Sequence, residues 1–303
     1  MKNKAFFILM IFPVFVYSQK IRVFILAGQS NMNGFGYNKD LPEDLKAFQD
    51  VYIFQGNSVP DGDSGGGRGK WDLLRPGNGT GFKTDGKTNM LSDRFGPELS
   101  FAQKMKELFP GEKIALIKYA REGTSIDSLA AAGFGCWDAD FKGKNGLNQY
   151  DHFLKTLKNA LYETDIDKNG KKDDLIPSGI VWMQGEGDAS YTEEIAGRYY
   201  IHLKTLMNQM RAALLTDDLP VVIGKISDSG KNEAGKVWPM GELVQYAQEK
   251  FAAKDGHAAI IRTTKKYNYG NDPWHYDSAG YIDLGKNFAE ELHRLMIIFE
   301  QHP

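Results

Sequence analysis

The sequence predicts an α/β protein in which a five-stranded parallel β-sheet lies between two layers of helices. Short apolar runs of strand length alternate along the chain with longer segments of helical periodicity. Most of these runs are continuous in Val, Ile and Leu, as is typical of strands buried on both faces. Such a βαβ alternation builds a three-layer sandwich through right-handed crossovers. The predicted strands are Ile21–Ala27, Lys113–Tyr119, Gly179–Met183, Pro220–Ile226 and Ala258–Thr263.

The first 18 residues are predicted to be a secretory signal that precedes the fold. Lys2 and Lys4 come before an apolar run over residues 5–17, and Ser18 follows with Val16 two residues before it. This is the three-part pattern of a signal peptide, and the run is shorter than the ~20 residues of a membrane-spanning helix. We expect a periplasmic or secreted protein, without membrane contact after cleavage, whose single domain covers residues 19–303.

Segments of helical character and one long loop connect the predicted strands. Gly34–Arg94 is rich in Gly, Asp and Asn and predicts a polar loop with one short strand, Val51–Phe54. The glycine run that starts at Gly62 lacks the spacing of a Walker phosphate-binding loop. Helices are predicted over Pro97–Leu108, Asp151–Tyr162, Thr192–Leu215, Gly241–Ala253 and Ser278–Phe299.

Charge and cysteine content exclude several classes of function. Lys and Arg total 37 against 39 Asp and Glu, which leaves a net charge of −2. No overall positive field exists to attract a nucleic acid, so no nucleic-acid partner is expected. Cys136 is the single cysteine and has no partner for a disulfide or redox pair, so we interpret it as a small buried side chain.

Candidate catalytic and ligand-binding residues follow directly after the predicted strands, which is where ligands bind in open parallel sheets. The first strand runs into Gly28-Gln29-Ser30-Asn31-Met32. This segment places a serine in a tight strand-to-helix turn similar to a nucleophile elbow, although a helix-capping serine is the alternative. Gly123 follows the second strand, where its backbone N–H can approach a ligand oxygen or simply form a turn.

The third and last strands are also followed by polar residues. After the third strand, the amide of Gln184 is able to donate to an oxyanion, whereas Glu186 and Asp188 serve equally well as helix caps. After the last strand, Asp272 lies three residues before His275. A carboxylate at this spacing can fix the tautomer of a catalytic imidazole, and a turn with a surface histidine is the alternative.

Taken together, these four segments resemble the blocks of the SGNH hydrolase superfamily, and within it the carbohydrate esterase family 6 and sialate O-acetylesterase-like group. The resemblance covers about residues 21–289. It implies a flavodoxin-like fold and a cofactor-free serine esterase that removes acetyl groups from sugars. The implied nucleophile, base and orienting acid are Ser30, His275 and Asp272. The implied oxyanion donors are the backbone N–H groups of Ser30 and Gly123 and the Gln184 side chain, with Gln29, Asn31 and Glu186 in support. Glu122, which precedes Gly123, departs from the glycine that this group often has there.

The predicted function is hydrolysis of an O-acetylated carbohydrate, with xylan or a related polysaccharide as the expected substrate. A sialate O-acetylesterase, a lipase or thioesterase, and a non-catalytic sugar-binding protein on the same scaffold remain as alternatives. Trp71, Trp137 and Trp274 either present aromatic surfaces to a sugar ring or pack in the interior.

One acidic segment lies outside this pattern. Asp165, Asp167, Asn169 and Asp173 occupy ligand positions of a calcium loop, with Gly170 at its sixth position. The twelfth position is Ile176 in place of the bidentate Glu, although Asp174 is a possible substitute. A weak structural calcium site and a solvated acidic loop are the two interpretations.

Overall fold

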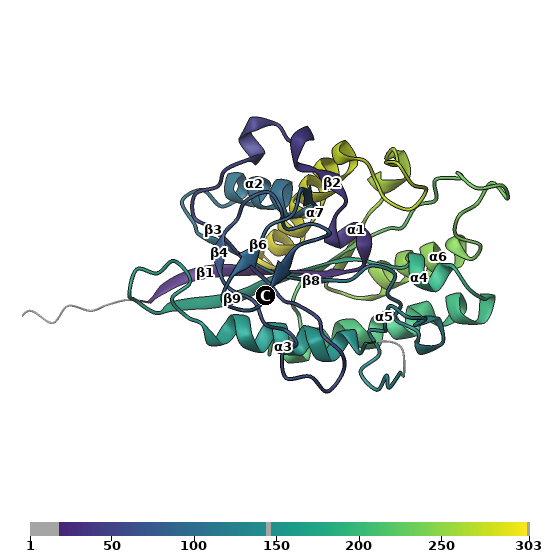
Figure 1. Ribbon diagram of the computed structural model, residues 1–303, viewed down its shortest axis with the longest axis horizontal. Helices are drawn as coiled ribbons and strands as arrows, with labels where there is room; N and C mark the ends of the chain where they lie inside the picture. Colours follow the sequence, from purple (N-terminus) through teal and green to yellow (C-terminus); the bar gives the residue numbers. More distant parts are fainter. Residues whose placement is uncertain (1–17, 144–146, 302–303) are drawn as a thin grey trace, which may run out of the picture.

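A twisted sheet with helices on both faces forms the centre of the molecule (Figure 1). The computed structural model describes residues 18–143 and 147–301. The predicted signal peptide therefore lies outside the described residues, apart from Ser18. The strands are β1 Gln19–Gly28, β2 Gly36–Tyr37, β3 Val51–Gln55, β4 Asp72–Leu73, β5 Lys83–Thr84, β6 Asn89–Met90, β7 Arg94–Phe95, β8 Ile114–Ala120, β9 Asp173–Met183, β10 Val221–Gly224 and β11 Ala258–Ile261.

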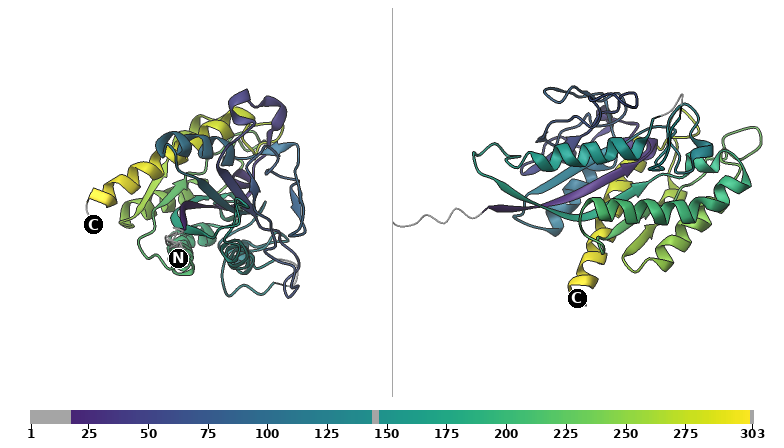
Figure 2. Two further views of the ribbon diagram at one scale, coloured as in Figure 1. Left: turned by 90° about the vertical axis from the view of Figure 1, so that its left-hand side faces the viewer. Right: turned by 90° about the horizontal axis from the view of Figure 1, so that it is seen from below.

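The α-helices are α1 Ser30–Asn33, α2 Glu98–Leu108, α3 Gln149–Tyr162, α4 Glu186–Ala189, α5 Glu193–Ala213, α6 Gly241–Lys254 and α7 Ser278–Gln301. Short 3₁₀ helices cover Asn38–Asp40, Glu43–Leu45, Ser128–Ala130 and Thr263–Lys266. Helices α2 and α7 pack together on one face of the sheet, and α3 and α5 lie on the other (Figures 1 and 2). Each of the five predicted helices is present, with ends displaced by a few residues, and the three-layer α/β class is confirmed.

The strand count was predicted incorrectly, because the main sheet has seven strands in the order β11-β10-β9-β1-β8-β3-β4. The additional strands come from the polar segment Gly34–Arg94. Strand β3 pairs in parallel with β8, and the two-residue β4 adds an antiparallel edge. The short strand expected at Val51–Phe54 is thus part of the main sheet. Strand β4 is too short to produce a recognisable apolar pattern.

One buried ion pair interrupts the apolar interior. Lys118 in β8 is completely buried, and its ammonium donates to Glu98 of α2 at 2.7 Å and to the backbone carbonyls of Asn33 and Asn78, both at 2.8 Å. These bonds satisfy all three ammonium donors. They connect the sheet to α2, to the end of α1 and to the polar segment, and so hold these elements in place around the strand ends.

Candidate active site

The three central strands end level with one another. Gly28, the last residue of β1, pairs with Ala120 of β8 on one side and with Met183 of β9 on the other. Its φ is +143°, and a Cβ atom there would lie 2.0 Å from the carbonyl oxygen of Met183. Only glycine fits this position. Because the three strands end level, the loops that follow them start side by side.

A pocket of about 430 Å³ lies over these strand ends. It brings together residues from all four sequence segments, because α1, the loop after β8, α4 and the loop before α7 all contribute to its wall. The lining residues are Gln29, Ser30, Glu122, Gly123, Phe134, Glu186, Gly187, Ser190, Tyr191, Trp238, Trp274 and His275.

The imidazole in this wall is held from one side by a carboxylate. Nδ1 of His275 lies 2.8 Å from Oδ2 of Asp272, and Oδ1 of Asp272 accepts the backbone N–H groups of Trp274 and His275 at 2.8 and 2.9 Å. Phe35 stacks on the imidazole with ring centroids 3.6 Å apart. Partial burial raises the pKa of Asp272, but the hydrogen bonds from His275 and Trp274 outweigh it and keep that pKa below its ordinary value. Nε2 of His275 forms no hydrogen bond with any described residue, and the residue lines the pocket.

Asn31 and Glu186 form a second polar contact, below the imidazole loop. The Asn31 side-chain amide donates to Oε1 of Glu186 at 2.8 Å and to the backbone carbonyl of Trp274 at 3.2 Å. Its oxygen accepts the hydroxyl of Tyr281 at 2.8 Å. Burial raises the pKa of Glu186, although the bond from Asn31 opposes this effect. These contacts join α1 and α4 to the loop that carries His275, whereas the bond to the imidazole comes from Asp272.

Gln184 lies beneath the pocket and does not contribute to its wall. Its side chain is completely buried. Its Nε2 donates to the carbonyl of Thr124 at 3.0 Å and to Oδ2 of Asp188 at 2.7 Å, and its Oε1 accepts the Tyr199 hydroxyl at 3.0 Å. Both amide hydrogens of Gln184 therefore already have acceptors among the described residues.

Gln29, in contrast to Gln184, lines the pocket. Its Oε1 accepts the backbone N–H groups of Gly185 and Gly187, both at 3.2 Å. These two bonds fix the amide and leave its NH₂ group without an acceptor among the described residues, in a side chain that lines the pocket. The backbone N–H groups of Ser30 and Gly123 likewise donate to no described residue. Three unused donors therefore surround the pocket floor.

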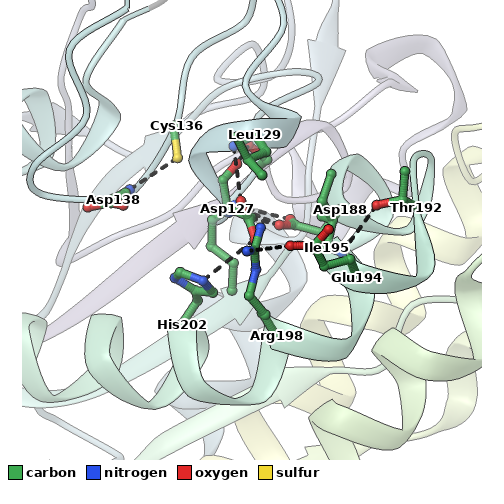
Figure 3. A network of polar contacts seen from close by, with 12 residues as sticks. Asp127, Leu129, Cys136, Asp138, Asp188, Thr192, Glu194, Ile195, Arg198 and His202 are labelled. Atoms are coloured by element: carbon green, nitrogen blue, oxygen red, sulfur yellow. Dashed lines mark hydrogen bonds and ion pairs between the residues drawn. The ribbon is translucent and has the colours of Figure 1, made fainter.

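A polar network fixes the loop that follows Gly123 (Figure 3). The Asp188 carboxylate accepts the backbone N–H of Asp127 at 2.9 Å and that of Ile126 at 3.1 and 3.2 Å. Arg198 of α5 pairs in turn with Oδ2 of Asp127 at 2.8 Å. Burial raises the pKa of Asp188 to about 7, against the lowering effect of these hydrogen bonds. The network holds the loop against α4 and α5.

The tryptophans and the cysteine have distinct environments. Trp71 and Trp137 are buried and donate to the carbonyl of Ala160 and to the Thr124 hydroxyl, so both pack in the interior. Trp274 is 48% exposed and lines the pocket. Cys136 is completely buried, which raises its thiol pKa to about 12 and removes it as a nucleophile.

Aromatic residues that sequence reasoning missed complete the pocket wall. Phe134, Tyr191 and Trp238 join Trp274 there. They come from three separate loops or helix ends and follow no periodic pattern. Of these three aromatic residues, only Tyr191 could have been predicted to line the pocket, because it lies three positions after Asp188, close to the polar residues of the third segment.

The predicted calcium ligands lie at the opposite end of β9 from these loops, next to the start of that strand. Asp165, Asp167 and Asp173 each have a carboxylate oxygen within 4.8 Å of the others. The amide of Asn169 donates to Asp167 at 2.8 Å. Oδ1 of Asp173 is buried without a partner among the described residues, which fits a cation ligand. The ammonium of Lys113 pairs with Asp167 and supplies one positive charge to the cluster.

The fold, together with a family match over most of the chain, identifies a carboxylic ester hydrolase. A family model described as carbohydrate esterase, sialic acid-specific acetylesterase, matches residues 20–294. Because the match covers most of the sequence, the chain belongs to this family of carbohydrate acetylesterases.

Solved structures show the same fold. A protein from Arabidopsis thaliana is 19% identical over 90% of this chain and 98% of its own, with a TM-score of 0.63. NanS is 14% identical over 95% of this chain and 100% of its own, with a TM-score of 0.58. A carbohydrate acetylesterase from Xanthomonas citri is 17% identical over 91% of this chain, with a TM-score of 0.57. This chain spans 56% of that protein. No curated protein sequence matches the chain significantly. Within the described ranges, no helix combines the length and hydropathy of a membrane span.

Proposed function

We propose that the protein is a serine esterase that removes O-acetyl groups from acetylated xylan or a related polysaccharide, with Ser30 as nucleophile. The observation that carries the proposal is the imidazole of His275, bound by Asp272 at Nδ1 and lining one pocket with Ser30. An imidazole fixed in this way is oriented to accept a proton at Nε2.

The reaction follows from these positions. Ser30 Oγ attacks the acetyl carbonyl carbon while His275 accepts the hydroxyl proton. The tetrahedral intermediate then collapses, the C–O bond to the sugar breaks, and His275 protonates the departing sugar oxygen. Water, deprotonated by the same imidazole, attacks the acetyl carbonyl carbon, the bond to Ser30 Oγ breaks, and His275 returns the proton to Oγ as acetate leaves. This sequence requires no cofactor.

Three donors stabilise the negative oxygen of the intermediate in this proposal. They are the backbone N–H groups of Ser30 and Gly123 and the side-chain amide of Gln29, which replaces Gln184 in this role. Support comes from the two bonds that orient Gln29 and from the commitment of the Gln184 amide elsewhere. Donors held in place before the reaction stabilise the developing charge without reorganisation.

The composition of the wall favours an uncharged acetylated sugar in this pocket. The lining residues include Phe134, Tyr191, Trp238 and Trp274 and contain neither Lys nor Arg. Aromatic side chains provide apolar faces with polar edges, which suit a sugar ring. The carboxylate of a sialic acid would find no positive charge there and would meet Glu122 and Glu186. The export predicted from residues 1–18 fits a polysaccharide substrate.

Acetate release from acetylated xylan, O-acetylated sialic acid and acetylated pectin tests this function, with Ser30→Ala as the inactive control. We expect the fastest release from xylan and steeply falling rates along a series of nitrophenyl esters as the acyl chain lengthens. Octanoate hydrolysed as fast as acetate would contradict an acetylesterase. Sugar binding without acetate release would support the non-catalytic alternative.

A further inference from the structure

A second cleft, of about 600 Å³, opens beside the catalytic pocket. Glu122 is the one residue that lines both, so the two cavities meet at the end of β8. The other walls come from the end of β3, the residues that follow it, and the polar segment around β5. The long Gly-rich segment that interrupts the α/β pattern thus builds most of this cleft.

An unpartnered amide lines the cleft. Gln55, the last residue of β3, is only 6% exposed, and its Oε1 is buried without a hydrogen bond to any described residue. Buried polar atoms are nearly always paired in native proteins, because an unpaired one lowers stability. A donor group on a ligand in the cleft would satisfy this oxygen.

The same cleft contains an arginine without an acidic partner. Nε of Arg121 is buried with no acceptor among the described residues, and no carboxylate of those residues pairs with its guanidinium. The guanidinium lies 5.9 Å from the ring centroid of Tyr119. The neighbouring Glu122 forms no ion pair with it and instead accepts hydrogen bonds at Oε1 from Asn33 and Thr80. A guanidinium without an acidic partner can bind a carboxylate through two parallel hydrogen bonds.

We infer that this cleft is a subsite for the sugar unit next to the acetylated one, with Arg121 binding the carboxylate of an acidic sugar and Gln55 accepting from its hydroxyl groups. The inference rests on the proposed function and extends it, because it assigns a polysaccharide with acidic sugar units as the substrate. The acetylated unit lies over Ser30, and the chain continues past Glu122 into the cleft.

Calorimetric binding to Ser30→Ala, which prevents turnover, tests the subsite with deacetylated ligands. The probes are a xylo-oligosaccharide that bears one uronic acid, the same oligosaccharide without it, and free sialic acid. We expect about ten- to hundredfold tighter binding of the acidic oligosaccharide, in the range of a charge-assisted hydrogen bond. Adding Arg121→Gln should abolish that preference, whereas Arg75→Gln, which removes one exposed charge elsewhere, should retain it.

Gln55→Leu provides a second variant that separates binding from folding. It removes an unpaired buried amide, so its melting temperature should equal or exceed that of the unmodified protein, while its KM for the acetylated acidic oligosaccharide should rise about fivefold or more. Arg75→Gln, which alters neither cavity, should leave both this KM and the rate on nitrophenyl acetate unchanged.

Three results would overturn the subsite. They are equal binding of the acidic and neutral oligosaccharides, an unchanged preference in Arg121→Gln, and a loss confined to sialic acid, which would place the carboxylate on the acetylated sugar itself. A failure of the proposed esterase is distinguishable, because it would appear as absent nitrophenyl acetate hydrolysis in the unmodified protein whatever the binding results.

Discussion

Replacing Gln29 with Glu should remove one oxyanion donor while the surrounding structure stays intact. Gln29 receives hydrogen bonds at Oε1 from Gly185 and Gly187, both at 3.2 Å. A glutamate of the same shape keeps that acceptor and converts the NH₂ group at the other end into a carboxylate oxygen. Loss of one such donor costs about 10²–10³ in kcat, or about 2.7–4 kcal/mol. The new negative charge repels the oxyanion, so we expect a loss at the upper end of this range, with a smaller change in KM.

The assay is steady-state hydrolysis of nitrophenyl acetate together with a thermal melt, and Gln184→Met is the matched comparison. Methionine at this position removes the donor to Thr124 and Asp188. Each buried group left unpaired costs about 1–3 kcal/mol, so Gln184→Met should melt earlier. A folded Gln184→Met without activity, next to a Gln29→Glu with kcat close to that of the unmodified enzyme, would refute the reasoning and return the donor role to Gln184.

Three further predictions concern the carboxylates. Asp272→Asn should fold normally and lose on the order of 10⁴ in kcat, as in a serine protease, whereas Glu186→Gln should retain most of its rate; the reverse result would make Glu186 the orienting acid. Burial raises the pKa of Asp188 from 3.8 to about 7, so its contribution to the free energy of unfolding should fall by up to about 4 kcal/mol as the pH rises between these values. Between about pH 5 and about pH 8, urea unfolding should show a smaller decrease in the free energy of unfolding for Asp188→Asn than for the unmodified protein. An equal decrease in both would contradict the raised pKa of Asp188. We also propose that residues 165–173 bind Ca²⁺, in which case millimolar Ca²⁺ should raise the melting temperature above that in EDTA and Asp173→Asn should abolish the rise; no rise would leave Lys113 as the cation of the cluster.

The sequence was informative wherever one property decided the structure. Continuous apolar runs identified five parallel strands, and the polar residues at their ends identified Ser30, Gly123, Asp272 and His275, which the structure brings to one region. Periodicity could not anticipate Lys118, whose burial depends on Glu98 and on two distant carbonyls, one at the end of α1 and one in a loop. The two-residue β4 likewise depends on pairing with β3, since it has no apolar pattern of its own.

The two glutamines show why the remaining part of the site required coordinates. Gln29 and Gln184 both follow a central strand directly, and both amides have the same chemistry. Which amide faces the pocket depends on where its oxygen is bound. Backbone N–H groups bind Gln29, whereas Gln184 donates to Thr124 and to Asp188. No local sequence rule contains this information, because each set of partners joins two segments more than 50 positions apart.

The five residues from Gln184 to Asp188 therefore determine the positions of two of the three proposed donors at once. Gly185 and Gly187 orient the amide of Gln29, while Gln184 and Asp188 fix the loop that carries Gly123. Gly187 also approaches that loop so closely that a Cβ atom would lie 2.4 Å from the carbonyl oxygen of Thr124. A displacement of this segment would move the Gln29 amide and the Gly123 N–H together. In the proposed mechanism, the polar residues after β9 thus contribute by holding other donors in place before the substrate arrives, which is the arrangement that electrostatic stabilisation of an oxyanion requires.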